Sequence, residues 1–263
     1  MEHTLSPVIH NAAFRNVGLD WIYLAWPVVP EQLEAAIGGL RALGATGVNV
    51  TMPHKETVIP LLDEVSGDAR VVGAVNTIQL LGDKFIGHNT DVDGFHQFLV
   101  ADAGVDVGGL RALILGAGGA ARAVVKALDD LGAGEIAVVA RRPERGANLL
   151  ELATHGPATV VAWEEAEARA GEFDLIVNAT PVGTGSGDPL PNTNFHPRQL
   201  VIDLIYDPPS TALVERAKSQ GAKAWGGLGM LVHQAAASFR IWTGQEAPIE
   251  IMSAAALHAV LKR

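Results

Sequence analysis

A glycine-rich turn placed directly after a short apolar segment constrains this chain more than any other feature of its sequence. The run Arg111 to Leu115 (RALIL) predicts a buried strand, and Gly116-Ala117-Gly118-Gly119-Ala120-Ala121 follows it and opens a predicted helix over Ala120 to Leu131. In the pattern G-x-G-x-x-(G/A) the first glycine permits a tight turn and the second lets a pyrophosphate approach the backbone. The run therefore predicts a dinucleotide site, with a turn that serves packing alone as the alternative.

The rhythm of apolar segments around this turn predicts the fold class. Further runs of strand length occur at Glu135 to Ala140, Asp174 to Ala179 and Leu200 to Ile205. Continuous apolar strands separated by helices are typical of a parallel sheet covered on both faces. We predict an α/β fold with a Rossmann-like parallel-sheet domain over residues 92–226.

The segments on either side of this domain are mixed and predict a smaller α/β domain over residues 1–91, completed by C-terminal helices over 227–263. Spacing of apolar residues, turn residues and prolines gives the expected elements. They are helices over Pro30 to Leu43 and Lys55 to Leu62, a strand over Gly47 to Thr51, a hairpin of Asn76 to Leu80 with Lys84 to Gly87, and tail helices over Met230 to Thr243 and Ile249 to Lys262.

Composition excludes several classes of function. With 19 Lys plus Arg against 29 Asp plus Glu in 263 residues, the net charge is −10, which disfavours nucleic acid as a partner. The absence of cysteine excludes disulfides, thiolate nucleophiles and Cys-ligated zinc, and fits a reducing compartment. No apolar run approaches the ~18 residues of a membrane span, and no signal pattern opens the chain. We expect a cytoplasmic protein that acts on a small molecule and not at a membrane.

The end of the second predicted strand indicates which dinucleotide binds. An acidic residue there would bond the ribose hydroxyls of NAD, but the sequence has Ala140-Arg141-Arg142-Pro143-Glu144-Arg145. Guanidinium groups of Arg141, Arg142 and Arg145 suit a 2′-phosphate, so we predict NADP(H) as cofactor. A solvated basic turn is the alternative.

Short polar segments of the first domain and the tail, taken in series, resemble one family. They are Thr4-Leu5-Ser6-Pro7, Asn49-Val50-Thr51-Met52-Pro53-His54-Lys55-Glu56, Gly73-Ala74-Val75-Asn76-Thr77, Asn89-Thr90-Asp91, Asn178-Ala179-Thr180, Asp203-Leu204-Ile205-Tyr206 and Gly227-Leu228-Gly229-Met230-Leu231-Val232-His233-Gln234. Together with the glycine turn, they resemble the shikimate dehydrogenases nearly from end to end.

This resemblance implies a two-domain enzyme that reduces 3-dehydroshikimate to shikimate with NADPH in aromatic amino-acid (chorismate) biosynthesis. By motif, it implies Lys55 and Asp91 as the catalytic pair. The substrate contacts it implies are Thr4, Ser6, Thr51, Asn76, Tyr206 and Gln234, and it places Leu204, Gly227 and Met230 near the cofactor. The chemistry suits these residue types, because hydride transfer to a ketone leaves an alkoxide that an ammonium group can stabilise and protonate.

The match also has departures, and they leave alternatives open. Family members usually begin with a strand ahead of the Ser-x-Ser loop, whereas only three residues precede Thr4 here, so we expect that strand to be absent. The rival functions are a quinate/shikimate dehydrogenase that prefers NAD, and a paralogue that binds nucleotide with weak or no turnover.

Three smaller expectations concern a possible dimer surface, a possible metal site and a helix cap. Trp21, Trp26 and Trp242 are candidates for a homodimer surface, although scattered aromatic residues are usually core or isolated surface residues. His88, Asp91, Asp93 and His96 crowd together, but they lack the later acidic ligands of a calcium loop, so we predict no metal site. We expect Asp93 instead to cap the helix through Phe95 and Phe98.

Overall fold

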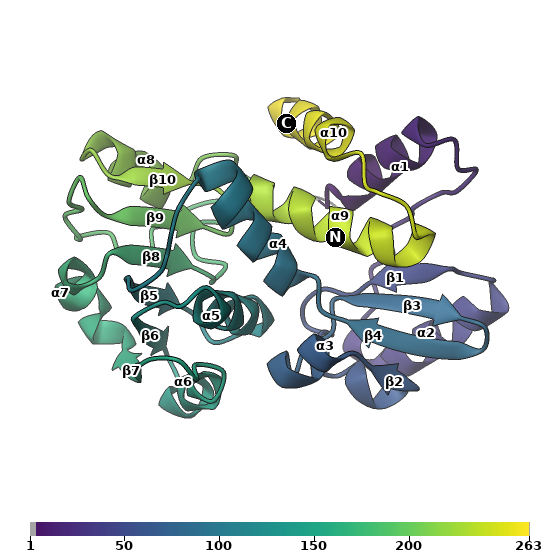
Figure 1. Cartoon of the computed structure of the whole chain (residues 1–263), viewed down its shortest axis with the longest axis horizontal. Coiled ribbons are helices and arrows are strands. Elements are labelled where there is room, and N and C mark those ends of the chain that lie inside the picture. The colour runs from purple at the N-terminus through teal and green to yellow at the C-terminus, as the bar shows by residue number, and fades with distance from the viewer. Residues whose placement is uncertain (1–3, 263) are drawn as a thin grey trace. The chain divides into compact units, whose positions relative to one another are not determined.

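The computed structural model describes residues 4–262 and divides into two compact units. Unit 1 comprises Met1–Gly94 and Val232–Arg263, and unit 2 comprises Phe95–Leu231 (Figure 1). The boundaries between the units follow Gly94 and Leu231, whereas the sequence analysis placed them after residues 91 and 226. Two helices, α4 (Asp91–Gln97) and α9 (Leu228–Thr243), contain the points of division.

Unit 2 contains a parallel six-stranded sheet with the order β10-β9-β8-β5-β6-β7. Numbered from β5 as the first strand and read from the β7 edge, this is the order 3-2-1-4-5-6 of the Rossmann fold, which confirms the predicted class. The strands are β5 (Arg111–Leu115), β6 (Glu135–Ala140), β7 (Ala158–Ala162), β8 (Leu175–Asn178), β9 (Leu200–Asp203) and β10 (Lys223–Trp225). The sequence analysis missed β7 and β10, two strands with partly exposed residues that lie at the edges of the sheet.

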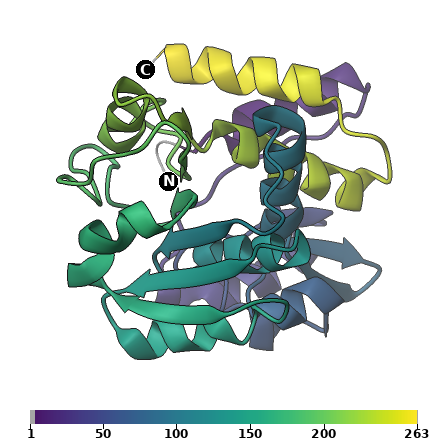
Figure 2. The same ribbon diagram turned by 60° about the vertical axis from the view of Figure 1, so that its left-hand side comes forward.

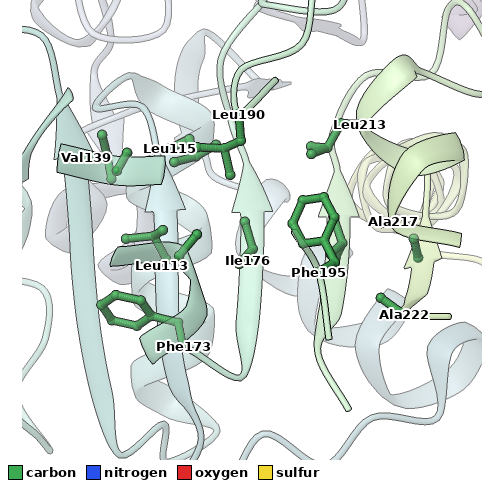
Figure 3. Close-up of a cluster of buried hydrophobic side chains, with 14 of the residues drawn as sticks. Leu113, Leu115, Val139, Phe173, Ile176, Leu190, Phe195, Leu213, Ala217 and Ala222 are labelled. Carbon is green, nitrogen blue, oxygen red and sulfur yellow. The ribbon is translucent and has the colours of Figure 1, made fainter. Parts of the chain in front are cut away.

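Helices cover both faces of this sheet, as the apolar character of its central strands requires. Figures 1 and 2 show α5 and α6 on one face and α7 and α8 on the other. Phe173, Leu190, Phe195 and Leu213 pack with strand residues such as Ile176 in the core on the second face (Figure 3). The helical segments of unit 2 are η3 (Phe98–Ala103, a π-helix that continues α4), α5 (Gly119–Asp130), α6 (Pro143–Leu150), η4 (Trp163–Glu165), α7 (Ala166–Arg169), η5 (Ala170–Glu172) and α8 (Ala212–Ser219).

Unit 1 contains a smaller mixed sheet with the order β1-β3-β4-β2. Its strands are β1 (Gly47–Asn49), β2 (Glu64–Val65), β3 (Thr77–Leu81) and β4 (Lys84–His88), and β3 and β4 form the predicted hairpin. The helical segments are α1 (Ser6–Asn16), η1 (Pro30–Gln32), α2 (Leu33–Ala42), η2 (Ile59–Leu61), α3 (Gly67–Val72), the end of α9, and α10 (Ile249–Leu261). Leu33, Ile37 and Leu40 of α2 pack in one apolar core with Ile78 and Phe85.

The C-terminal segment of unit 1 is tied to its sheet by specific contacts. The indole Nε1 of Trp242 on α9 donates to the carbonyl of Ile78 at 3.0 Å, and Gln79 Nε2 donates to the carbonyl of Ile241 at 2.7 Å. Helix α10 packs beside α1. Trp242 is only 8% exposed, so its proposed place on a dimer surface was wrong, whereas Trp21 and Trp26 are exposed.

The predicted helix over Lys55 to Leu62 was wrong. The segment forms turns and then the short 3-10 helix η2. A helix would need the carbonyl of Lys55 for an internal bond, but that carbonyl accepts from Val75 N at 2.8 Å. Pro60 also lacks an N–H group and disfavours helical backbone at the residue before it.

The start of the chain differs from expectation in another way. Ser6 opens the 11-residue helix α1, which the sequence analysis missed. No strand precedes α1 among the described residues, and the three residues ahead of Thr4 lie outside them. Residues 19–29 follow α1 without regular secondary structure and expose Ile22, Leu24 and Trp26.

Candidate functional site

The centre of the candidate site in unit 1 is a short, largely buried ion pair. Lys55 Nζ lies 2.6 Å from Asp91 Oδ2, and the two side chains are 15% and 7% exposed. Lys55 comes from the irregular segment after β1, and Asp91 is the first residue of α4. A carboxylate in the first turn of a helix is favoured by the helix dipole. The structure thus brings together two residues that are 36 positions apart in the chain.

Asn76 fixes the second oxygen of this carboxylate. Its Nδ2 donates to Asp91 Oδ1 at 2.9 Å and to Thr90 Oγ1 at 2.9 Å, and its Oδ1 accepts from Thr90 N at 2.7 Å. Both oxygens of Asp91 therefore have donors, which offsets the cost of burying the charge. This arrangement leaves the ammonium group of Lys55 oriented by Asp91 and the carboxylate oriented by Asn76.

A hydroxyl cluster continues the network away from the ion pair. Ser238 Oγ on α9 lies 2.8 Å from Thr77 Oγ1 and 3.2 Å from Thr90 Oγ1, and Asn49 Nδ2 donates to Ser238 Oγ at 3.0 Å. The sequence analysis did not predict that the side chains of four residues would form one hydrogen-bonded cluster, namely Asn49, Thr77, Thr90 and Ser238. The first three lie inside the motifs quoted above, but Ser238 stands in an apolar helical stretch and carries no such signal.

Tyr23 connects this cluster to the predicted substrate residues at the start of α1. Its hydroxyl donates to Asn49 Oδ1 at 2.9 Å and also forms a side-chain hydrogen bond with Ser6. Burial disfavours the phenolate and raises the pKa of Tyr23 to about 12, so the hydroxyl keeps its proton. Thr4 Oγ1 donates to Ser6 Oγ at 3.3 Å. Thr4, Ser6, Asn76, Lys55 and Asp91 thus belong to one hydrogen-bonded system.

Three other predicted substrate residues take different positions. Thr51 lies two residues beyond β1 and is exposed. Gln234 lies one turn before Ser238 on α9, and the hydroxyl of Ser238 donates to its carbonyl at 3.0 Å. Gly94 on α4 lies against the backbone of Gln234, where a Cβ would come within 2.8 Å of its nitrogen. Tyr206 belongs to unit 2, on the segment after β9.

In unit 2 the glycine turn lies where the two neighbouring strands β5 and β8 end. Gly116 has φ +113°, and a Cβ there would lie 3.0 Å from the carbonyl oxygen of Ala179. Its N–H donates to Val139 O at the end of β6. A Cβ on Gly118 would meet no atom within 4 Å, so space is open above this turn. The first turn of α5 directs N–H groups without helical partners from the same place, which suits a phosphate.

A buried carboxylate holds the next two loops at this edge of the sheet. Asp203, at the end of β9, accepts from Asn178 Nδ2 at 2.9 Å, Ile205 N at 3.1 Å and Thr211 Oγ1 at 2.7 Å. Burial raises the pKa of Asp203 despite these donors. Asn178 also donates to Val182 O at 3.0 Å. The sequence analysis quoted Asn178 and Asp203 as motif letters and missed this role.

The predicted cofactor residues after β9 come together through their backbones. Gly227 N donates to Ile205 O at 2.9 Å, and a Cβ on Gly227 would lie 2.1 Å from the carbonyl oxygen of Leu204. Only glycine permits this approach. Met230 follows in the first turn of α9 and is 8% exposed.

Arg141 and Arg142 directly follow β6, and Arg145 lies in the first turn of α6. All three side chains are exposed. Since β6 neighbours β5, the arginines begin two residues beyond Val139, whose carbonyl bonds to Gly116 of the glycine turn. Their position suits a phosphate carried by a ligand of that turn.

The prediction that Asp93 caps the helix was wrong. Asn89 Oδ1 accepts from Asp91 N at 3.0 Å and Val92 N at 3.3 Å, and so caps α4, while Asp93 Oδ2 lies 3.3 Å from Arg240 Nη2. An asparagine two residues before the first helical residue forms the cap because its side chain reaches back over the open N–H groups. Within residues 4–262 no three His, Asp or Glu side chains are grouped to hold a metal ion, and none of the helices there has the length and apolarity to cross a bilayer.

Comparison with known proteins gives consistent matches. Three family models match: the shikimate dehydrogenase substrate binding domain over residues 1–78, shikimate / quinate 5-dehydrogenase over 99–185, and the shikimate 5'-dehydrogenase C-terminal domain over 227–257. The chain is 44% identical to shikimate dehydrogenase (NADP(+)) of Methanopyrus kandleri, covering 98% of this chain and 92% of that protein.

Two solved structures are similar over nearly the whole chain. The shikimate 5-dehydrogenase of Thermus thermophilus, in complex with NADP(H) and shikimate, has a TM-score of 0.88 at 39% identity and covers 98% of this chain and 95% of that one. That of Listeria monocytogenes, in complex with shikimate and NAD, has a TM-score of 0.85 at 35% identity, with 96% and 91% covered.

Proposed function

The chain belongs to the shikimate dehydrogenase family, and from this premise we propose that it catalyses the reversible NADPH-dependent reduction of 3-dehydroshikimate to shikimate. The observation that carries this proposal is the buried pair of Lys55 and Asp91, held by Asn76 in the same unit as the other polar side chains of the motifs. The proposed role is in aromatic amino-acid biosynthesis in the cytoplasm.

The residues of unit 2 fit NADPH. The open space above Gly118 leaves room for a pyrophosphate at the first turn of α5. Arg141, Arg142 and Arg145 would hold a 2′-phosphate. Gly227 and Met230 would lie near the nicotinamide, and Leu204 would lie near the cofactor. When bound, the cofactor supplies the hydride that reduces a ring ketone.

In the reduction, Lys55 is the proposed acid. Its ammonium group donates a hydrogen bond to the ketone oxygen and transfers a proton from Nζ as negative charge develops there. Asp91 holds the ammonium group of Lys55 in one orientation. In the reverse direction the amine of Lys55 must accept the hydroxyl proton of shikimate.

The hydroxyl and amide groups of Ser6, Thr51, Asn76 and Gln234, with those of Thr4 and Tyr206, are the proposed contacts for the carboxylate and ring hydroxyls of the substrate. Such a site offers both donors and acceptors. A compound that leaves one of these polar groups unpaired would bind poorly, which gives selectivity.

Shikimate oxidation, followed by the absorbance of the reduced cofactor, tests the proposal. We expect activity with NADP, and Lys55→Ala should lower kcat by roughly 100- to 10,000-fold. Lys84→Ala is the matched control, because Lys84 is an exposed lysine of the same unit that pairs with Glu64. A Lys55→Ala enzyme with full turnover would remove Lys55 from the mechanism.

Two further arms separate the rival functions. Faster turnover with NAD than with NADP, or with quinate than with shikimate, would favour the NAD-preferring quinate/shikimate dehydrogenase. No turnover with either cofactor, together with measurable NADP binding, would favour the paralogue that binds nucleotide without catalysis.

A further inference from the structure

His10 on α1 is a buried polar residue that the proposed reaction does not use. Its side chain is fully buried, and among the described residues neither ring nitrogen has a hydrogen-bond partner. Burying a polar group without a hydrogen bond destabilises a fold. An apolar side chain would avoid this cost, so packing alone does not explain a histidine at this position.

The imidazole of His10 lies flat against the ring of Tyr23. The two ring centroids are 4.6 Å apart, and the ring planes differ by 7°. The rings of Phe14 and Trp242 also contact the imidazole, but they are tilted from it by 34° and 46°. Burial lowers the pKa of His10 to about 3 and raises that of Tyr23 to about 12, so both stacked rings are neutral at pH 7.

The next residue of α1 fixes the backbone of Tyr23. Asn11 Nδ2 donates to Tyr23 O at 3.0 Å, and Tyr23 N donates to Asn11 Oδ1 at 2.7 Å. Residues 19–29 have no regular secondary structure, so the backbone polar groups of Tyr23 need such partners. His10 therefore holds the ring of Tyr23, and Asn11 holds its main chain.

The hydroxyl of Tyr23 reaches two residues of the candidate site. It donates to Asn49 Oδ1 at 2.9 Å and also forms a hydrogen bond with Ser6. Ser6 precedes His10 by four residues on α1, so the two side chains lie on the same face of the helix. Tyr23 spans this face, with its ring on His10 and its hydroxyl at Ser6.

We propose that His10 and Asn11 are positioning residues, which hold the hydroxyl of Tyr23 at Ser6 and Asn49 and thereby orient Ser6 for the substrate. This inference rests on the proposed function, in which Ser6 contacts the substrate. Tyr23 supports residues that bind the substrate, whereas the proposed acid is Lys55. Loss of the positioning residues should therefore weaken the binding of substrate and transition state alike, which raises KM for shikimate and leaves kcat nearly unchanged.

Steady-state kinetics of shikimate oxidation with NADP tests this split between KM and kcat. His10→Leu removes the flat ring and should raise KM for shikimate about tenfold, with kcat within about twofold. His10→Phe keeps a flat ring and should recover most of the loss. The matched control is Phe14→Leu, one turn further along α1, because the ring contacts of Phe14 are with His10, Trp21 and Phe239. It should leave KM unchanged even where it lowers stability.

A double-mutant cycle separates positioning from packing. Tyr23→Phe removes the hydroxyl and should itself raise KM for shikimate about tenfold. In that background His10→Leu should change KM by less than about twofold, because no hydroxyl is left to position. Effects on KM that simply multiply would overturn the proposal, and so would a His10→Leu enzyme whose loss lies in kcat.

The ionisation of Tyr23 gives a readout that needs no turnover. A hydrated tyrosine ionises near pH 10, about two units below the pKa of Tyr23. The chain has two tyrosines, so ring-¹³C-labelled tyrosine gives two NMR signals, which the Tyr206→Phe variant assigns. At pH 10.5 Tyr23 should stay protonated in the unaltered chain and in Phe14→Leu, and should be largely ionised in His10→Leu. Circular dichroism at the same pH checks that the fold is retained.

Asn11→Ala carries the same tests if His10→Leu does not fold, because Asn11 is only partly buried and lies outside the aromatic cluster. It should raise KM and favour the ionised form of Tyr23 in the same way. An unaltered chain without turnover would contradict the proposed function, and the ionisation of Tyr23 would still decide this inference. Normal turnover, together with a Tyr23 that stays protonated in both variants, would overturn the inference alone.

Discussion

The two units build their candidate sites from different parts of the chain. In unit 2 the site is made mainly by the backbone: a glycine turn, open N–H groups and close backbone approaches at the carboxyl edge of a regular sheet. In unit 1 the site consists of side chains whose positions depend on one another through buried hydrogen bonds. We expect substitutions in unit 1 to change the rate of the reaction and substitutions in unit 2 to change the handling of the cofactor.

Asp91→Asn offers the largest test of this contrast. The amide loses the charge that orients Lys55, while its shape fits the same place. We expect kcat for shikimate oxidation to fall by about 100-fold or more, with the affinity for NADP unchanged, as steady-state kinetics and cofactor titration would show. Asp93→Asn, two residues further along α4, should leave both parameters near their original values. Loss of NADP affinity in Asp91→Asn would break the proposed division between the units.

Gly227→Ala is the corresponding test in unit 2. Its Cβ would lie 2.1 Å from Leu204 O, so the two backbone segments must separate. Because a displacement of about 1 Å can cost roughly 100-fold, we expect kcat/KM measured with NADPH to fall by about that factor. Gly171→Ala is the control, since its Cβ would meet no atom within 4 Å. If Gly227→Ala and Gly171→Ala have the same kcat/KM with NADPH, the close approach of Gly227 to Leu204 does not affect the reaction.

The arginines after β6 should affect cofactor choice and little else. Replacing both Arg141 and Arg142 by Ala removes charged donors for a 2′-phosphate, each worth about 1.5–3 kcal/mol. We expect the preference for NADP over NAD, measured as the ratio of kcat/KM values, to fall by at least about tenfold. Arg169→Ala, another arginine of unit 2 that pairs with Glu172, serves as the control. An unchanged ratio would assign Arg141 and Arg142 to a solvated turn.

The last test concerns the stability of unit 1 toward acid and not the activity. His10 is fully buried among Phe14, Tyr23 and Trp242, and burial lowers its pKa from 6.5 to about 3. Below pH 6.5 the unfolded chain therefore binds a proton that the folded chain does not. As a result, the free energy of unfolding decreases as the pH is lowered. The slope is about 1.4 kcal/mol per pH unit between pH 6.5 and about 3.

Urea unfolding of unit 1 at several pH values measures this slope. His10→Leu should flatten it by one proton, whatever its effect on stability at pH 7. The carboxyl of Asp203 in unit 2 changes stability with pH in the opposite direction. Burial raises its pKa, so the folded form binds a proton more readily than the unfolded one. An acid slope in unit 1 that is the same with and without His10 would contradict this account.

Regularity explains which parts of the fold could be predicted. The central strands of unit 2 are continuous apolar runs, so β5, β6, β8 and β9 were predicted to within two residues at either end. In unit 1 the strands are short and partly exposed, and the segment from Lys55 bonds to Val75 in place of forming a helix. The apolar pattern of the segment from Lys55 gave no indication that it would bond to Val75.

The sequence by itself determined the backbone half of the chemistry: the glycine turn after a strand, the arginines that follow the next strand, and the presence of Lys55 and Asp91 in recognisable motifs. Only the tertiary structure decided which side chains support that pair. Ser238 lies 161 positions from Thr77 and 189 from Asn49, yet it bonds to both. Local propensity acts over a few residues, whereas a buried polar group must find its partners wherever packing brings them, so such a network appears only once the chain is folded.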